Sequence, residues 1–300
     1  MKLVNYSDQG STKVGIVYGD LIFDLRKEGA SLGLVRSDFK DIDQILAEGA
    51  LDAVLRAQGT VGSMSGGIPL AEAKVLPPLL RPEKILCVAL NYVSHLKEGN
   101  VGPPPEPYFF AKFRNAIIGP GDDIVIPKIS EKVDWEAELA VVIGRSGKYI
   151  PKEDAMDYVA GFTVANDISF RDLQFPPGWP EKTNPLGQNW IKGKSLDTAF
   201  PLGPWLVTKD DVPDPNNLRI SLSVNGKVMQ DSTTAEMVSK VDRLVASASE
   251  GITLKPGDII STGTPLGVAA FSGQPFLKAG DVVEATVGGV GTLRNQVRSE

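Results

Sequence analysis

The sequence predicts an α+β fold, with a core of mixed β-sheet or β-roll type, flanking helices and a small N-terminal α+β domain. Short apolar runs rich in β-branched residues outnumber helical stretches, and the two do not alternate strictly as they do in parallel α/β folds. The 300 residues exceed the usual size of one domain, so we expect a large domain with a smaller annex. The proline-rich stretch at 76–84 is the expected boundary, which gives domains of 1–75 and 76–300.

The N-terminal domain is expected to contain three short strands followed by a helix. The strand-like runs are KLVNY at 2–6, KVGIVYG at 13–19 and LIFDL at 21–25, and Gly19–Asp20 predicts a hairpin turn between the last two. Residues 41–59 carry apolar side chains at spacings of three and four, which predicts an amphipathic helix.

The larger domain is expected to be rich in strands. Three segments share a Gly-Asp turn followed by an apolar run, and they lie at 119–127, 255–262 and 278–287. Asn225–Gly226 predicts a further hairpin. Helical patterns interrupt the strands at 151–161, which begins with proline, and at 233–251, which ends with glycine.

Composition and charge exclude several classes of protein. The hydrophobic content of 42% and the charged content of 23% are ordinary for a soluble globular protein. The net charge of −6 argues against nucleic acid or an anionic membrane as the main partner, and no apolar stretch approaches the length of a membrane span. The single cysteine, Cys87, and the lack of an apolar signal segment predict a cytoplasmic protein.

The stretch DWEAELAVVIG combines a buried strand with two carboxylates. Residues 139–143 predict a strand that is buried on both faces, and Glu136 and Glu138 share one face because side chains alternate along a strand. Buried carboxylates need a positive charge beside them. Asp167 follows the apolar run 162–165 and is placed similarly. An all-oxygen set favours Mg²⁺, Mn²⁺ or Ca²⁺ over zinc, and pairing with surface lysine or arginine is the alternative.

His95 is the only histidine in the sequence, and Glu98 lies three residues beyond it. In a helix these two side chains share a face. A carboxylate beside an imidazole fixes its tautomer and raises its basicity, as a general base requires. The pair is therefore a candidate catalytic dyad; a surface histidine beside an acidic neighbour is the alternative.

Four motifs occur in an order and at spacings that resemble the fumarylacetoacetate hydrolase family. They are DWEAELAVVIG, NDISFRDLQ, GKSLD with PLGPWLVT, and STGTPLGV, all within residues 76–300. The small N-terminal part resembles the short bacterial or archaeal members. The resemblance implies the mixed β-sheet core of that family, a homodimer, and one divalent cation bound by Glu136, Glu138 and Asp167. That cation would be Mg²⁺ or Mn²⁺, or Ca²⁺ in crystals.

The resemblance also implies roles for single residues. Lys194 matches a catalytic lysine that could hold an oxyanion or enolate, and His95 with Glu98 matches the dyad that activates water in hydrolytic members. Four further residues match positions that lie near or contact the substrate: Lys112, Arg171, Gln174 and Thr264. The segment 175–190, rich in proline, glycine and tryptophan, is expected to rim the site.

These assignments predict a divalent-metal-dependent hydrolase that cleaves a carbon–carbon bond in a small 2,4-diketo acid, of the acylpyruvate, fumarylpyruvate or diketo-deoxy sugar acid type. The alternative is a metal-dependent decarboxylase or isomerase of a β-keto or hydroxy-diene-dioic acid, of the oxaloacetate decarboxylase or homoprotocatechuate-pathway type. A catalytically silent binder of small molecules is a third interpretation, and the intact His95–Glu98 pair argues against it. Product analysis separates the first two, because the hydrolase yields two acids and the alternative yields carbon dioxide or a rearranged acid. A metal-dependent turnover assay tests the silent binder.

Overall fold

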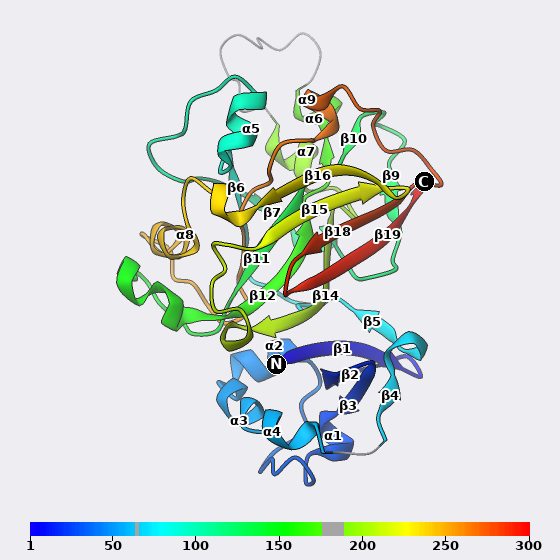
Figure 1. The fold of residues 1–300 in the computed structure, drawn as a ribbon, viewed down its shortest axis with the longest axis vertical. Helices are drawn as coiled ribbons and strands as arrows, with labels where there is room; N and C mark the ends of the chain where they lie inside the picture. Colours follow the sequence, from blue (N-terminus) through cyan, green and yellow to red (C-terminus); the bar gives the residue numbers. More distant parts are fainter. Residues whose placement is uncertain (64–65, 176–188) are drawn as a thin grey trace.

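The computed structural model of the chain describes residues 1–63, 66–175 and 189–300, and Figure 1 shows how its elements are arranged. Within these residues the predicted α+β class is confirmed, with mixed sheets and flanking helices. Most of the segment that was expected to rim the site, residues 175–190, lies outside the described residues.

Twelve strands of the described chain form one mixed sheet. Its order is β4-β3-β2-β1-β14-β12-β11-β17-β6-β7, with β5 beside β1 and β8 beside β14. These strands are β1 (Lys2–Asp8), β2 (Ser11–Tyr18), β3 (Leu21–Asp24), β4 (Ile68–Pro69), β5 (Lys74–Leu76), β6 (Ile85–Ala89), β7 (Tyr108–Lys112), β8 (Ile117–Ile118), β11 (Ala137–Ile143), β12 (Val159–Asn166), β14 (Phe200–Thr208) and β17 (Ile259–Ser261).

A second sheet lies against the middle of the first (Figure 1). Its order is β16-β15-β18-β19-β9, and it contacts β11, β12 and β14. Its strands are β9 (Ile124–Ile126), β15 (Arg219–Val224), β16 (Lys227–Thr233), β18 (Val282–Val287) and β19 (Gly291–Ser299), and a separate pair is formed by β10 (Val133–Asp134) and β13 (Ser169–Phe170).

The helices are short and lie around the sheets. They are α1 (Leu25–Glu28), α2 (Ile42–Ala47), α3 (Leu51–Leu55), α4 (Gln58–Val61), α5 (Val93–Glu98), α6 (Arg171–Gln174), α7 (Trp190–Lys194), α8 (Val241–Ala248) and α9 (Ala269–Ser272). The 3₁₀ segments are η1 (Leu70–Glu72), η2 (Arg114–Ala116), η3 (Lys152–Tyr158), η4 (Lys209–Asp211) and η5 (Thr234–Glu236), of which η3 is the longest. None of the helices in the described residues is long and apolar enough to cross a membrane.

The predicted helices are shorter than their sequence patterns suggested. The helix expected over 41–59 is divided into α2, α3 and α4, because Gly49 adopts a left-handed φ of +65° after α2 and ends it. The helix expected over 233–251 begins only at Val241, since a strand end and a 3₁₀ turn occupy the residues before it. Apolar spacing thus located both helices but not their ends.

The N-terminal part lies at one end of the molecule and continues the large sheet (Figure 1). Strand β1 pairs antiparallel with β14, which places Lys2 opposite Val207. The predicted hairpin at Gly19–Asp20 is confirmed, because Tyr18 pairs with Leu21 across it. The division at residue 75 stays a prediction.

The centre of the large sheet positions the site. Strand β11 lies between β12 and β17, and all of its residues are buried, as its apolar sequence predicted. The antiparallel register pairs Ala137 with Asn166 and Glu138 with Ala165. The start of β11 and the end of β12 therefore lie side by side, and both carry carboxylates.

Candidate active site and metal centre

Three carboxylates lie together at one end of the β11–β12 pair. Glu136 precedes β11, Glu138 lies within it and Asp167 follows β12 directly. The Asp167 amide donates a hydrogen bond to the Glu136 carbonyl oxygen (2.9 Å), which extends the strand pairing by one step. One carboxylate oxygen from each residue lies within 4.8 Å of the others, and all three residues are buried. Backbone pairing thus forms the cluster that the sequence pattern suggested.

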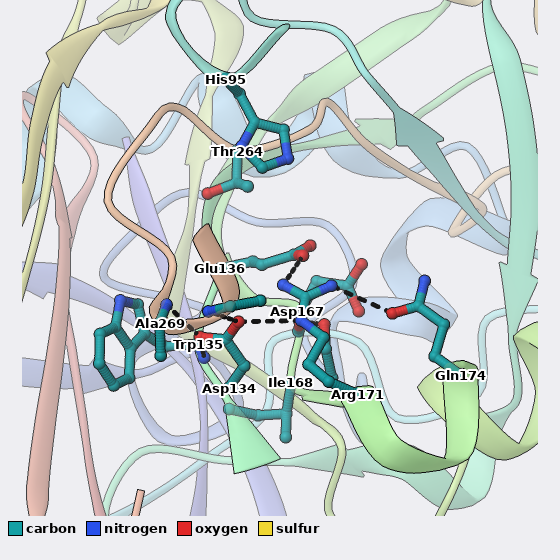
Figure 2. Close-up of polar contacts among 12 residues, drawn as sticks. His95, Asp134, Trp135, Glu136, Asp167, Ile168, Arg171, Gln174, Thr264 and Ala269 are labelled. Carbon is teal, nitrogen blue, oxygen red and sulfur yellow. Dashed lines mark hydrogen bonds and ion pairs between the residues drawn. The ribbon is translucent and has the colours of Figure 1, made fainter. Parts of the chain in front are cut away.

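Three cationic side chains contact the cluster. Lys194 Nζ lies 2.7 Å from Glu136 Oε2 and 3.0 Å from Asp167 Oδ2. Lys112 Nζ lies 2.6 Å from Asp167 Oδ1. Arg171 Nη2 lies 2.6 Å from Glu136 Oε1, as Figure 2 shows. Glu136 and Asp167 therefore each contact two positive groups, which reduces the free-energy cost of burying their charges.

Glu138 has neutral partners instead. Its Oε2 accepts hydrogen bonds from Ser261 Oγ and from the Gly263 amide. Burial, followed by the negative charges of Asp167 and Glu136, raises the pKa of the Glu138 carboxyl well above its ordinary value. A positive charge beside Glu138 would lower that pKa, so this carboxyl is the part of the cluster that most needs a cation.

Burial opposes the charged form of the other groups, and neighbouring charges decide the outcome. Burial disfavours ionised Glu136, but the charges of Lys194 and Arg171 outweigh it and hold the pKa of Glu136 below its ordinary value. Burial lowers the pKa of Lys112, which Asp167 offsets only in part. Lys194 is equally buried, yet Asp167 and Glu136 raise its pKa. Lys194 is thus held as a cation beside the pocket.

The donor set fits a hard divalent cation. Oxygen atoms from three buried carboxylates converge, and such ligands suit Mg²⁺ and Mn²⁺. Burial, followed by repulsion from Asp167 and Glu136, raises the pKa of Glu138, and a cation among the three carboxylates would relieve that repulsion. The cluster of Glu136, Glu138 and Asp167 therefore indicates a divalent metal site.

The predicted dyad lies on α5, and its two side chains face each other. His95 Nδ1 lies 3.3 Å from Glu98 Oε2. A carboxylate only accepts hydrogen bonds, so in a neutral imidazole this contact places the proton on Nδ1 and leaves Nε2 as an acceptor. The amide of Gly267 donates to both Glu98 oxygens, at 3.1 and 3.3 Å, and fixes the carboxylate from the other side.

One small pocket, of about 70 Å³, is lined by one member of the dyad and one member of the acidic cluster. His95, Glu136 and Lys194 all line it, which brings a base, a carboxylate and a cation to one space. Aromatic rings form another part of its wall, where Phe110 and Trp190 stack with their centroids 4.5 Å apart. The pocket therefore suits a small acid whose polar end faces the charged residues and whose remaining part lies against the aromatic wall.

The residues predicted to bind substrate lie at two depths. Arg171, Gln174 and Thr264 line the pocket. Lys112 is not among the lining residues, because its ammonium group is fully buried against Asp167. A role of Lys112 in substrate binding stays a prediction, and its position is better suited to holding Asp167.

Sequence analysis missed two buried polar residues that support the site. Asp134 accepts a hydrogen bond from Arg171 Nε (2.8 Å), and Gln230 Nε2 donates to Thr264 Oγ1 (2.9 Å). Asp134 lies two residues before Glu136, so the alternation that paired the two glutamates was a signal for it as well. Gln230 is far from the other site residues in the chain, and no local pattern indicates its role.

A family model and two curated relatives match most of the chain. A family model described as fumarylacetoacetate (FAA) hydrolase C-terminal matches residues 84–298. The mitochondrial oxaloacetate tautomerase fahd2 of Xenopus laevis is 45% identical to the chain, over 99% of this chain and 90% of its own length. The mitochondrial oxaloacetate tautomerase FAHD2A of Homo sapiens is 47% identical, over 86% and 80% respectively.

Solved structures show the same fold at lower identity. A 5-carboxymethyl-2-hydroxymuconate delta-isomerase from Mycobacterium smegmatis is 32% identical with a TM-score of 0.75, and each chain is covered in full. A maleylpyruvate hydrolase from Sphingobium sp. SYK-6, in complex with manganese(II) ion and pyruvate, is 30% identical with a TM-score of 0.77, over 100% of this chain and 99% of its own.

The predicted cytoplasmic location was wrong on this comparison. The two tautomerases just described are named as mitochondrial proteins. The prediction used the single cysteine and the lack of an apolar segment. Neither feature separates one reducing compartment from another, because a mitochondrial transit peptide is amphipathic rather than apolar.

Proposed function

Because this chain belongs to the fumarylacetoacetate hydrolase family, we propose that it is a divalent-metal-dependent tautomerase of oxaloacetate, which interconverts the keto and enol forms. The main support is that the His95–Glu98 dyad and the acidic cluster line or adjoin one small pocket. The relatives with 45–47% identity are named for this reaction, whereas the hydrolase neighbour is 30% identical. The carbon–carbon hydrolase predicted from sequence is therefore the second candidate.

The reaction requires one proton to move and no water to be consumed. His95 Nε2 accepts a proton from the carbon next to the keto group, and that C–H electron pair forms the carbon–carbon double bond of the enol. The carbonyl electron pair passes to oxygen, which then takes up a proton. The Glu98 carboxylate accepts the hydrogen bond from Nδ1–H of His95, so Nε2 is the nitrogen free to accept a proton.

The other side chains bind the acid and stabilise negative charge. Lys194 lines the pocket, where its ammonium group would stabilise the developing enolate oxygen. Arg171 lines the same pocket and suits a substrate carboxylate. A divalent cation bound by Glu136, Glu138 and Asp167 would supply Lewis-acid polarisation of the keto oxygen.

The hydrolase remains the second candidate because the same dyad can activate water. A base that takes a proton from carbon can also take one from water, and a hydrolase of the family shares the fold. The decarboxylase needs the electron sink but not the base. Decarboxylation should thus depend less on His95 than tautomerisation or hydrolysis does.

Product identity decides among the candidates. The protein loaded with Mg²⁺ or Mn²⁺ is incubated separately with enol-oxaloacetate, acylpyruvates and diketo sugar acids, and the products are followed by ultraviolet absorbance and NMR. We expect accelerated enol–keto conversion of oxaloacetate with no loss of carbon. Faster formation of two acids from an acylpyruvate, or release of carbon dioxide as the main reaction, would overturn the proposal.

A further inference from the structure

Asp134 is a fully buried carboxylate that no site prediction included. Its Oδ1 accepts hydrogen bonds from its neighbour's amide, Trp135 N (2.9 Å), and from Ala269 N (2.7 Å). Its Oδ2 accepts from Arg171 Nε (2.8 Å) and from Ala270 N (3.1 Å). Figure 2 shows Asp134 between the Arg171 guanidinium and Ala269. One carboxylate therefore joins two segments that are far apart in the chain.

On one side Asp134 orients Arg171. The guanidinium donates from Nε to Asp134, from Nη1 to Gln174 Oε1 (3.1 Å) and from Nη2 to Glu136 Oε1 (2.6 Å). A guanidinium is planar and rigid, so fixing Nε also fixes the directions of both terminal nitrogens. Asp134 thus determines how Arg171 faces Glu136 and the pocket.

On the other side Asp134 holds the start of α9, and this segment contacts the dyad. The Phe271 ring packs edge-on against the His95 ring, with centroids 5.6 Å apart. The Gly267 amide donates to Glu98, and its carbonyl accepts from Trp135 Nε1 (3.1 Å). Residues 267–271 therefore touch both members of the dyad.

Gly267 shows how closely this segment is fitted. Its φ of +99° lies in the region that favours glycine, and a Cβ there would meet the Met229 carbonyl oxygen at 2.1 Å. Only glycine fits at position 267, where the backbone amide donates to Glu98. Two and three residues further on, the backbone amides of Ala269 and Ala270 donate to Asp134.

We propose that Asp134 is a positioning residue that couples the Arg171–Glu136 side of the pocket to the His95–Glu98 side. It does not line the pocket, and it acts through Arg171 and through the segment 267–271. Its effect on rate rests on the proposed tautomerase function, whereas its effect on the geometry of His95 does not.

The first test is Asp134→Asn, which keeps the shape but turns one acceptor into a donor. That donor faces an N–H group of Arg171 or α9, so at least one hydrogen bond is lost. We expect kcat/KM for oxaloacetate to fall roughly 10–100-fold, the usual effect of a residue that orients others in a site. The matched control is Asp231→Asn, which makes the same change at an exposed pair with Arg219 and is expected to leave kcat/KM unchanged.

A double-mutant cycle separates coupling from general damage. Arg171→Lys and Asp134→Asn are measured singly and together. If Asp134 acts through Arg171, the double variant loses far less than the product of the two single losses. Losses that simply multiply, at unchanged melting temperature, would contradict that part of the coupling.

The single histidine provides a readout that does not depend on activity. One imidazole gives one pair of ring-nitrogen NMR signals, and their positions report the tautomer. We expect the Nδ1–H form in the wild-type protein and a shift toward a mixture in Asp134→Asn, with Asp231→Asn unchanged. If Asp134→Asn does not fold, Arg171→Lys leaves Asp134 in place and is expected to shift the same signals by less. Wild-type His95 signals in the folded variant would overturn the proposal, whereas a wild-type protein without tautomerase activity would overturn only the proposed function.

Discussion

The two sides of the pocket are built in different ways. The acidic side lies at the start of β11 and the end of β12, in the middle of the large sheet. Two of its three carboxylates are held by cationic side chains, which are Lys112, Lys194 and Arg171. The dyad side lies on α5, a helix of six residues, and depends on contacts from Gly267 in the loop before α9 and from Phe271 in α9 itself. The charged groups thus lie at the central strands of the large sheet, while the candidate base is carried by a short helix that residues 267–271 contact. Substitutions of the metal-site carboxylates and of the dyad should therefore have separate effects on cation binding and on proton transfer, whereas a change at Asp134 should affect both sides.

Glu138→Gln tests the acidic side and should have the largest effect. It removes one of three converging carboxylates and keeps the shape, so we expect Mn²⁺ affinity to fall by more than the roughly 10–100-fold typical of an outer-sphere change. Catalysis should fall to the uncatalysed rate. Calorimetric titration with Mn²⁺ measures the affinity, and circular dichroism controls for folding. A titration within threefold of wild type would remove Glu138 from the metal site.

His95→Gln tests the dyad side of the pocket. Tautomerisation should fall by roughly 10²–10⁴-fold, since a positioned base is lost. Mn²⁺ affinity should remain at the wild-type value, because the carboxylate ligands belong to other elements. Decarboxylation of oxaloacetate should suffer less, because it needs no base. Tautomerisation at the wild-type rate in this variant would show that the proton is moved by another group.

Glu98→Gln tests the dyad further with a smaller change, because it keeps the shape of the side chain and removes its charge. Glutamine can still accept from His95 Nδ1 through its carbonyl oxygen, but it lacks the charge that favours the imidazolium. We expect a loss of about 10–100-fold in kcat, below that of His95→Gln. Steady-state kinetics of both variants in one buffer provides the comparison. A larger loss for Glu98→Gln would mean that Glu98, rather than His95, transfers the proton.

Asn5 lies in strand β1 of the N-terminal part, away from the pocket, so Asn5→Ala should leave both sides of the pocket intact. Asn5 is buried, donates to the Pro77 and Pro78 carbonyl oxygens and accepts from the Ile42 amide. Its loss leaves buried groups without partners, and we expect the free energy of unfolding to fall by about 1–3 kcal/mol. Urea denaturation measures this effect. The kcat of the folded protein should not change, and a large fall would show that the N-terminal part contributes to the pocket.

The sequence allowed prediction of those parts of the site that depend on local alternation. The apolar run of β11 and the two-residue spacing of Glu136 and Glu138 predicted a strand with two carboxylates on one face, and the structure has both. The three-residue spacing of His95 and Glu98 predicted their contact in the same way.

Contacts between residues that are far apart in the chain could not be predicted from local sequence patterns. Asp134 bonds to Ala269 across 135 residues, and Ala137 N donates to Gln230 across 93, so no local period relates them. The break in the helix expected over 41–59 depends on one glycine conformation that apolar spacing does not encode. Sequence therefore predicted which candidate site residues lie together better than it predicted the residues that hold them.

The most direct test of a metal-dependent tautomerase is removal of the cation from the wild-type protein. The rate of enol-oxaloacetate conversion is measured before chelation, after it, and after return of Mg²⁺ or Mn²⁺, with metal content checked by elemental analysis. We predict that the rate falls to the uncatalysed value in the metal-free protein and returns on addition of either cation. A metal-free protein that converts the enol at the original rate would contradict the account.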